Sequence, residues 1–263
     1  MSGYQFLQID HAVGCATVWL NRPDRHNAFH AGLISELGQC LTQLSQDSAV
    51  RVIVLAGRGR NFCAGADLEW MQQQARADYE ANLEDARRLA LMLRSLAQSP
   101  KPTVARVQGV ALGGGMGLVA GCDIALATHD ASFGTTEVRL GLTPSTIAPY
   151  VIAAIGERAA RYHFLAGDRF GADEAVRVGL VHQAVAPEAL DSCLAELLEA
   201  LRSAGPQAQA HCKRLLSSLR GHDAFDPLVL EQTARSIAEI RGGEEAREGM
   251  AAFFAKRKPG WTL

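Results

Sequence analysis

Three consecutive glycines and one downstream glutamate are the residues of this sequence best suited to carry chemistry. Gly113, Gly114 and Gly115 follow an apolar run at 104–110 and precede a small-residue segment that can begin a helix. The first amides of a helix have no partners within it, and the helix dipole favours negative charge, so this turn can hold a developing oxyanion. Glu137 follows in a mostly apolar neighbourhood. A carboxylate near an oxyanion site suggests acid-base chemistry; the alternatives are a flexible turn and a solvated surface charge.

A second turn of small residues precedes the first in the chain. Residues 63–67 read Cys-Ala-Gly-Ala-Asp and lead into the helical stretch 69–71. Small side chains here would let a flat ligand lie against the backbone and would leave an amide free to donate a hydrogen bond. The alternative is tight packing at a loop.

The elements that must position these turns alternate between strands and helices. Strands are expected at residues 4–9, 15–20, 51–56, 104–110, 123–127 and 180–185, and helices at 29–46, 78–98, 145–167, 172–178, 187–203, 205–220, 226–241 and 243–257. The first two strands flank Gly14 as a hairpin does, and Asn27 could cap the helix that follows. Strand, helix, strand is the order of a layered α/β arrangement. The helix-rich C-terminal third is expected to cover a sheet or to make subunit contacts.

Composition predicts an ordinary globular protein. The 263 residues are 48% hydrophobic, which is enough for one large domain or for one domain with a helical appendage. The net charge is −2 and the basic residues are scattered, so we expect no nucleic-acid partner. No apolar run approaches 18 residues and the N-terminus lacks a targeting pattern, so we expect no membrane span and a cytoplasmic location.

The cysteines give no sign of a metal centre or of a disulfide framework. Six are present, and they show neither CxxC spacing nor a Cys/His ligand pattern: Cys15, Cys40, Cys63, Cys122, Cys193 and Cys212. We interpret them as reduced, buried small hydrophobic residues, and we expect no metal site.

Four motifs together resemble the crotonase (enoyl-CoA hydratase/isomerase) superfamily. They are Asn-Arg-Pro at 21–23 with Asn-Ala at 27–28, the two small-residue turns at 62–68 and 109–115, and Cys-Asp-Ile at 122–124. The combination spans nearly the whole chain and is highly specific. The resemblance implies an α/β fold, a crotonase (ClpP-like) spiral of ββα units. Residues 1–186 would carry the acyl-CoA site, and the helical residues 187–263 would trimerise, giving a homotrimer or a homohexamer.

The resemblance also implies an acyl-CoA substrate whose thioester oxygen lies between the backbone amides of Ala66 and Gly114. Losing one such donor typically costs about 2.7–4 kcal/mol of barrier. Coenzyme A is part of the substrate, so no separate cofactor is expected. Besides these amides and Glu137, the predicted substrate-binding residues are Arg25, Ala64, Asp67, Leu68, Gly113, Gly117, Arg139, Thr143 and Lys256.

Some of these assignments have alternatives. The loop 64–68 would hold the adenine, as it does in the family, while Arg25 or Lys101 could face the phosphates. Lys256 either reaches the coenzyme A of a neighbouring subunit or is a solvated charge at a helix end.

The chain departs from the best-known family hydratases at one catalytic position. Those enzymes carry two glutamates, and the position of the first, shortly after the glycine turn, is Gly117 here. Only Glu137 remains, and an apolar pocket would raise its pKa enough for proton exchange near neutral pH. Replacing Gly117 by Glu is expected to recreate the pair of carboxylates.

The loop after Glu137 suggests a substrate. Residues 141–150, together with residues 66–71, are similar to the bacterial methylglutaconyl-CoA hydratases of leucine and acyclic-terpene breakdown. A glutaconyl substrate has a distal carboxylate, for which Arg139 is the nearest basic residue in sequence, although a surface role is equally open to it. Four residues of this loop carry hydroxyls that could bind water or that carboxylate: Thr143, Ser145, Thr146 and Tyr150.

Three functions follow from these features. The first is hydration of a 2-enoyl-CoA thioester, with 3-methylglutaconyl-CoA or a related branched enoyl-CoA as the expected substrate. The second is an enoyl-CoA delta-isomerase that uses Glu137 as its proton shuttle, which the glycine at 117 favours. The third is a non-catalytic or RNA-binding protein of the same fold; the presence of both small-residue turns and Glu137 argues against it.

Overall fold

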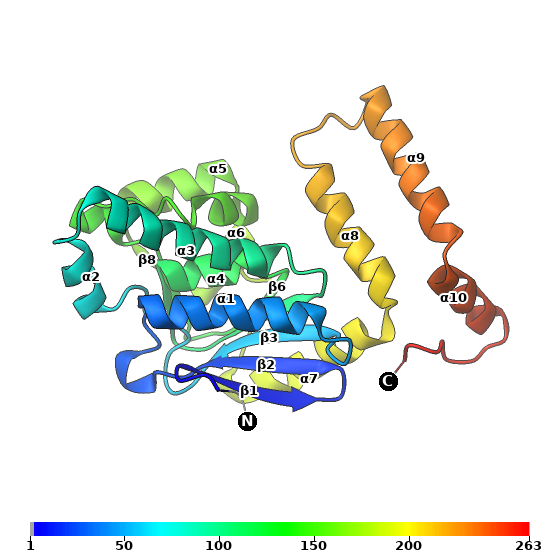
Figure 1. Cartoon of the computed structure of the whole chain (residues 1–263), viewed down its shortest axis with the longest axis horizontal. Coiled ribbons are helices and arrows are strands. Elements are labelled where there is room, and N and C mark those ends of the chain that lie inside the picture. The colour runs from blue at the N-terminus through cyan, green and yellow to red at the C-terminus, as the bar shows by residue number, and fades with distance from the viewer. Residues whose placement is uncertain (1–2, 263) are drawn as a thin grey trace.

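A six-stranded sheet is the scaffold of the computed structural model, which describes residues 3–262 (Figure 1). Its strands, in spatial order, are β1 (Leu7–Ala12), β2 (Cys15–Leu20), β3 (Val52–Gly57), β4 (Thr103–Val107), β6 (Ile124–Thr128) and β9 (Gln183–Val185). The predicted hairpin is confirmed, because β1 and β2 are antiparallel. The other neighbours are parallel. All residues of β3 are buried, as expected for a β-branched strand covered on both faces.

Helices cover both faces of this sheet (Figure 1). On one side lie α1 (Ala31–Gln46), α3 (Tyr79–Ala97) and α4 (Gly114–Gly121), and on the other lies α7 (Leu190–Ser203). The apolar spacing predicted for α1 is buried in the main core. Leu190 and Leu194 of α7 pack on apolar side chains of the sheet, so the helix that follows residue 186 is part of the packed layers. The division at that residue stays a prediction.

A smaller sheet carries the functional turns. It contains β5 (Val110–Leu112), β7 (Ser132–Gly134) and β8 (Arg169–Gly171). The single strand predicted at 104–110 is therefore wrong, since the chain turns at Gly109, between β4 and β5. Gly109 has φ of 62°, and a Cβ there would lie 2.2 Å from the carbonyl oxygen of Arg60. Only glycine fits this position, and the turn directs residues 110–114 into the second sheet.

The other helices agree with the predicted ones to within a few residues. They are α2 (Leu68–Gln74), α5 (Ala148–Ala166), α6 (Ala172–Val178), α8 (Pro206–Ser218), α9 (Pro227–Arg241) and α10 (Glu244–Phe254). The short helices η1 (Pro23–Arg25), η2 (Glu137–Leu140) and η3 (Pro187–Ala189) and the strands β7 and β8 were not predicted as separate elements. Two further details differ from expectation. The N-cap of α1 is His30 rather than Asn27, and α5 is interrupted at Gly156, whose φ is 74°.

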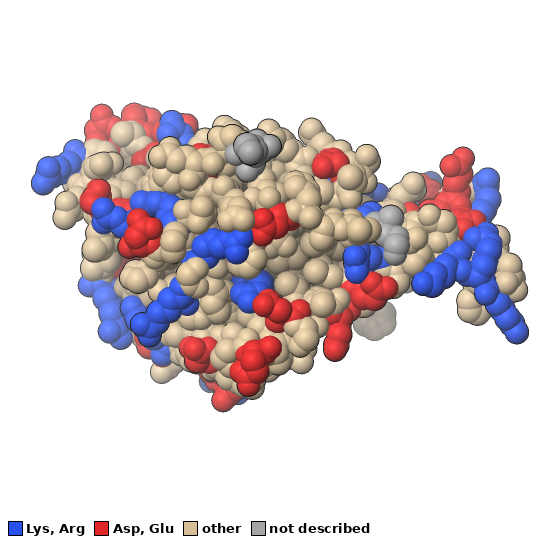
Figure 2. All heavy atoms as spheres, turned by 90° about the horizontal axis from the view of Figure 1, so that it is seen from below, with Lys and Arg blue, Asp and Glu red and all other residues tan. Residues whose placement is uncertain are grey.

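Helices α8 to α10 form an arm that projects from the body (Figures 1 and 2). Two basic side chains connect the arm to the body. Arg51 donates to the carbonyl oxygens of Ala204 and Trp261, and Lys213 pairs with Asp123. Large apolar side chains of the arm are exposed, among them Leu216, Phe225, Leu228, Phe253 and Phe254. Figure 2 shows basic and acidic side chains interspersed on the face it presents.

Within residues 3–262, no helix is both long and apolar enough to cross a membrane. That range also contains no group of three or more His, Cys, Asp or Glu side chains placed to hold a metal ion. Its six cysteines are free thiols, but Cys122 and Cys193 are half-buried and Cys212 is exposed, so the expected burial is wrong for these three.

Candidate active site

The glycine turn forms the start of α4, as its sequence predicts. Gly113 has φ of 49° and its amide donates to the carbonyl oxygen of Gly134, which ties the turn to β7. Gly114 is the first residue of α4, and its amide donates no hydrogen bond to another described residue. This amide is therefore a free donor at the positive end of a short, buried helix.

The second small-residue turn lies beside the first. The Cys63 amide donates to Val110, and the Leu112 amide donates to the Cys63 carbonyl oxygen, so this loop runs along β5. A Cβ on Gly113 would lie 3.9 Å from the Cα of Gly65. Within residues 3–262, the Ala66 amide also has no acceptor. The structure thus brings together two unpaired amides from loops some fifty residues apart, the arrangement an oxyanion requires.

Glu137 adds a proton carrier to this pair of amides. It begins η2, and a Cβ on Gly113 would lie 3.1 Å from its Oε1 atom. Its Oε2 atom is buried and has no hydrogen-bond partner among the described residues. Burial raises the pKa of the Glu137 carboxyl, because the ionised form loses its hydration. A desolvated carboxyl at the glycine turn can accept and return a proton near neutral pH.

Gly117 contacts an apolar side chain. A Cβ on Gly117 would lie 2.3 Å from the Cγ2 atom and 2.8 Å from the Cβ atom of Ile147, which is buried just before α5. The structure therefore contradicts one expectation: a glutamate at this position does not fit unless Ile147 is also changed. Contact of Gly117 with substrate stays a prediction.

We expect even Gly117→Ala to destabilise the protein. The added methyl group overpacks a rigid region, which typically costs about 1–3 kcal/mol of unfolding free energy. Ile147→Ala destabilises the protein by itself because it leaves a cavity, but the loss in the double variant should be smaller than the sum of the two single losses, because the Cγ2 atom nearest to the new Cβ is removed. Denaturant unfolding of the single and double variants measures both effects. An unchanged midpoint for Gly117→Ala would show that this space is open.

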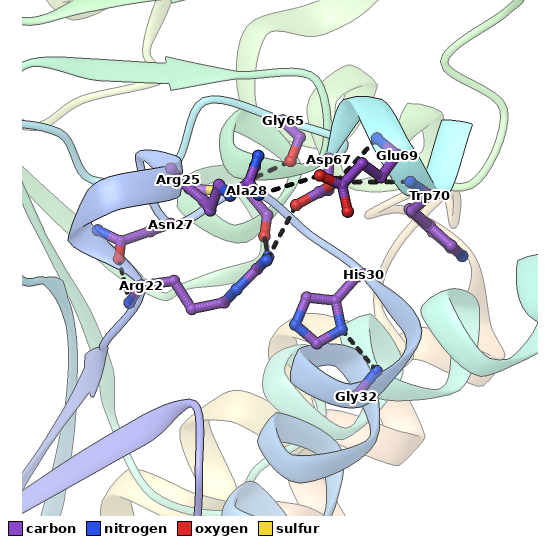
Figure 3. Close-up of polar contacts among 11 residues, drawn as sticks. Arg22, Arg25, Asn27, Ala28, His30, Gly32, Gly65, Asp67, Glu69 and Trp70 are labelled. Carbon is purple, nitrogen blue, oxygen red and sulfur yellow. Dashed lines mark hydrogen bonds and ion pairs between the residues drawn. The ribbon is translucent and has the colours of Figure 1, made fainter. Parts of the chain in front are cut away.

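Asp67 anchors the loop on which Ala66 lies (Figure 3). One carboxylate oxygen accepts from the amides of Glu69 and Trp70 and so caps α2, while the other pairs with Arg22 at 2.9 Å. Burial opposes ionisation of Asp67, but Arg22 and the two amides outweigh it and hold the pKa below its usual value. The Asp67 carboxylate is thus fully engaged within the protein, and the expected contact of Asp67 with substrate stays a prediction.

The basic residues proposed for coenzyme A lie in different places. Arg25 forms an exposed ion pair with Glu69 beside the loop. Lys101 donates to the carbonyl oxygens of Leu44 and Asp47 and caps the end of α1, so the structure does not place it toward a phosphate. Lys256 follows α10 on the arm and is exposed. Its role beside a neighbouring subunit stays a prediction.

The remaining predicted residues surround the loops. Ala64 donates to the His26 carbonyl oxygen, and Leu68, the first residue of α2, is exposed. Arg139 is exposed and its side chain lies close to Gly167. The hydroxyls of Thr143 and Ser145 are 2.5 Å apart in the exposed loop after η2. Contact of these residues with substrate stays a prediction.

Sequence reasoning missed three residues that position the site: Arg22, Asn27 and Phe29. Asn27 has φ of 55° and is completely buried; it accepts from the Arg22 amide and donates to the carbonyl oxygens of Arg58 and Asn61. Asparagine tolerates the left-handed region better than most residues. Arg22 and Asn27 stand in the motif that supported the family resemblance, and this was the available signal. Phe29 gave no such signal.

Comparison with known proteins agrees with this geometry. Residues 10–263 match the sequence profile of the family described as enoyl-CoA hydratase/isomerase. A crystal structure of an enoyl-CoA hydratase from Shewanella pealeana is 42% identical, with a TM-score of 0.95, over 98% of this chain and 97% of that one.

Two relatives that are named for different activities are each similar to this chain over most of their length. A short-chain-enoyl-CoA hydratase of Clostridium acetobutylicum is 31% identical over 92% of each chain. A 1,2-epoxyphenylacetyl-CoA isomerase of Escherichia coli is 32% identical over 95% of each chain. Together with two unpaired amides and a half-buried glutamate on the crotonase fold, these matches show that the chain is an enzyme of the enoyl-CoA hydratase/isomerase family.

Proposed function

We propose that this enzyme adds water to a 2-enoyl-CoA thioester through an enolate. The observation that carries the proposal is the buried, unpartnered carboxyl of Glu137 at the Gly113 turn, next to the free amides of Ala66 and Gly114. The amides would bind the thioester oxygen and stabilise the negative charge that it acquires. Glu137 would move the protons.

One carboxylate can serve both halves of a hydration. Ionised Glu137 accepts a proton from water as the water oxygen bonds to C3, and the electrons of the double bond pass to the thioester oxygen. The enolate then re-forms its carbonyl as the protonated carboxyl delivers that proton to C2. Water has been added, and Glu137 is ionised again. A raised pKa suits a group that must hold and release a proton in turn.

Isomerisation is the second candidate, and the packing of Ile147 on Gly117 favours it. This packing leaves no room for a second carboxylate there. Moving a double bond requires only that one group remove a proton from one carbon and return it to another.

The substrate we propose is 3-methylglutaconyl-CoA or a related branched enoyl-CoA, as in leucine breakdown. Support comes from the sequence of the loop 141–150, where the hydroxyls of Thr143 and Ser145 could bind a distal carboxylate. We further propose a cytoplasmic homotrimer or homohexamer. The exposed apolar side chains of the α8–α10 arm support self-association.

Liquid chromatography with mass spectrometry of the products tests the proposal, because the chromatography separates double-bond isomers of equal mass. Purified enzyme is incubated with 3-methylglutaconyl-CoA, crotonyl-CoA and a 3-enoyl-CoA in separate reactions. Gain of one water, fastest on the glutaconyl thioester, is expected. Conversion of the 3-enoyl-CoA without a mass change, in the absence of hydration, would establish the isomerase instead.

The pH dependence of kcat/KM should report Glu137. Its carboxylate must be ionised to accept the first proton, so activity is expected to fall as the pH drops through its pKa. Because burial raises that pKa, the acid limb should lie above 4.5, the ordinary value for glutamate. A pH–rate profile on the best substrate measures it, and activity that persists down to pH 4.5 would contradict the role of a desolvated Glu137.

A further inference from the structure

We propose that Arg22 and Asp67 are positioning residues whose ion pair aims the Ala66 amide at the thioester oxygen. The inference rests on the proposed enolate chemistry, and it assigns a role to side chains that lie outside the oxyanion site. The network is drawn in Figure 3.

Hydrogen bonds on either side of Ala66 fix the direction of its amide. Phe29 donates to the carbonyl oxygen of Gly65 at 2.7 Å, and its own carbonyl oxygen accepts from the Asp67 amide at 2.8 Å. In a planar trans peptide the C=O and the following N–H point in opposite directions. Binding the Gly65 carbonyl to Phe29 therefore directs the Ala66 N–H away from Phe29, where no described residue accepts from it.

Arg22 binds both backbone segments of this contact with one side chain. Its Nη1 atom donates to the Ala28 carbonyl oxygen at 2.6 Å, next to Phe29, and its Nη2 atom donates to Asp67 at 2.9 Å, next to Ala66. The planar guanidinium sets the distance between the two segments, which a lysine ammonium does not do with the same geometry. The ion pair therefore fixes the loop that carries Ala66 relative to the segment of Ala28 and Phe29 that aligns it.

Burial makes this bridge sensitive to the loss of either charge. The side chains of Arg22 and Asp67 are only 16% and 7% exposed. Removing one partner leaves the other charge poorly solvated, so the remaining group or the loop must move. A second ion pair, Arg25 with Glu69, joins the same two parts of the chain but is 54% and 69% exposed. Exposed pairs contribute little, which makes this pair a matched control.

Four variants test the proposal by steady-state kinetics. Asp67→Asn keeps a residue able to cap α2 but removes the charge. We expect it to lower kcat by about 10- to 100-fold, as a misplaced donor does, while KM changes by less than about threefold. Arg22→Lys should retain more activity than Arg22→Gln but less than the unchanged chain. Glu69→Gln should leave kcat within about twofold. Equal losses in Asp67→Asn and Glu69→Gln would overturn the proposal.

An infrared measurement separates this proposal from the identity of the reaction. Crotonyl-CoA labelled with 13C at the thioester carbonyl is bound to the Glu137→Gln variant, in which no turnover is expected. Two amide donors polarise the carbonyl and lower its stretching frequency. Adding Asp67→Asn should remove part of that shift without a comparable loss of affinity by calorimetry, while adding Glu69→Gln should not.

The outcomes are distinguishable. A full shift that survives in the Asp67→Asn chain overturns the positioning role and leaves the oxyanion site intact. Absence of any shift, or of binding, in the Glu137→Gln chain itself overturns the oxyanion site and with it the proposed function. In the same Glu137→Gln chain, a larger carbonyl frequency shift with Arg22→Lys than with Arg22→Gln would support the positioning role of the ion pair, because lysine restores the charge.

Discussion

Glu137→Gln is expected to abolish turnover while acyl-CoA binding persists. Glutamine has nearly the shape of glutamate but cannot carry the proton between water and carbon. General acid-base catalysis contributes about 10²–10⁴-fold to a rate, and we expect the upper end here because Ile147 occupies the space of a second carboxylate. The measurement is kcat by product formation, with the affinity for crotonyl-CoA followed by calorimetry.

Two controls separate this chemical effect from indirect effects. One is the unfolding midpoint of Glu137→Gln, and the other is the activity of a variant with the same change at the surface. An ionised carboxyl that is desolvated on folding costs stability, so its replacement by a neutral side chain is not expected to lower the unfolding midpoint. Glu69→Gln makes the same chemical change at an exposed residue and should retain full activity. If Glu137→Gln keeps more than about a tenth of the activity, another group carries the proton, and the hydroxyls of Thr143 and Ser145 become the place to look.

The features predictable from sequence are those with a local signal. The strand at 15–20 and the helix at 172–178 were predicted with the bounds that the structure has, because β-branched runs and helical spacing are read within a few residues. The two glycine-rich turns were recognisable for the same reason. The family resemblance then joined turns that are distant in the chain, and the structure places them side by side.

The features that could not be predicted depend on contacts between distant residues. Nothing near Gly117 in sequence indicates that Ile147, thirty residues later, fills its space. Nothing near Asp67 in sequence indicates that its carboxylate pairs with Arg22, a half-buried arginine 45 residues earlier. The division of one apolar run into β4 and β5 likewise depends on the carbonyl of Arg60 lying against Gly109. Such packing is visible only after the chain is folded.

Phe29 connects the two halves of the oxyanion site. Its backbone is hydrogen-bonded to both neighbours of Ala66, and its buried ring lies against Gly114. A Cβ on Gly114 would lie 2.6 Å from two atoms of that ring. The two amide donors are therefore coupled through one residue, Phe29. A substitution that enlarges residue 114 must shift α4, the Phe29 ring or both.

Gly114→Ala is accordingly expected to cost far more activity than a methyl group usually does. Displacing one oxyanion donor lowers kcat by about 10²–10³-fold, and here the clash disturbs the second donor through Phe29. Overpacking should also lower the unfolding free energy by about 1–3 kcal/mol. Gly121→Ala is the control in the same helix, because its added Cβ would lie 3.4 Å from Leu96, at the edge of ordinary contact. We expect that variant to keep nearly full activity.

A second substitution tests the proposed cause of the Gly114→Ala defect. Phe29→Leu removes the ring atoms that the new methyl group meets but leaves the Phe29 backbone bonds to Gly65 and Asp67 possible. If the clash displaces the amides, the double variant should be more active than Gly114→Ala alone, although Phe29→Leu by itself lowers stability by leaving a cavity. The activities of the four chains form a double-mutant cycle, in which a positive coupling is expected. Additive losses would mean that the Gly114 amide is disturbed independently of Phe29, and that the two donors are held by separate parts of the fold.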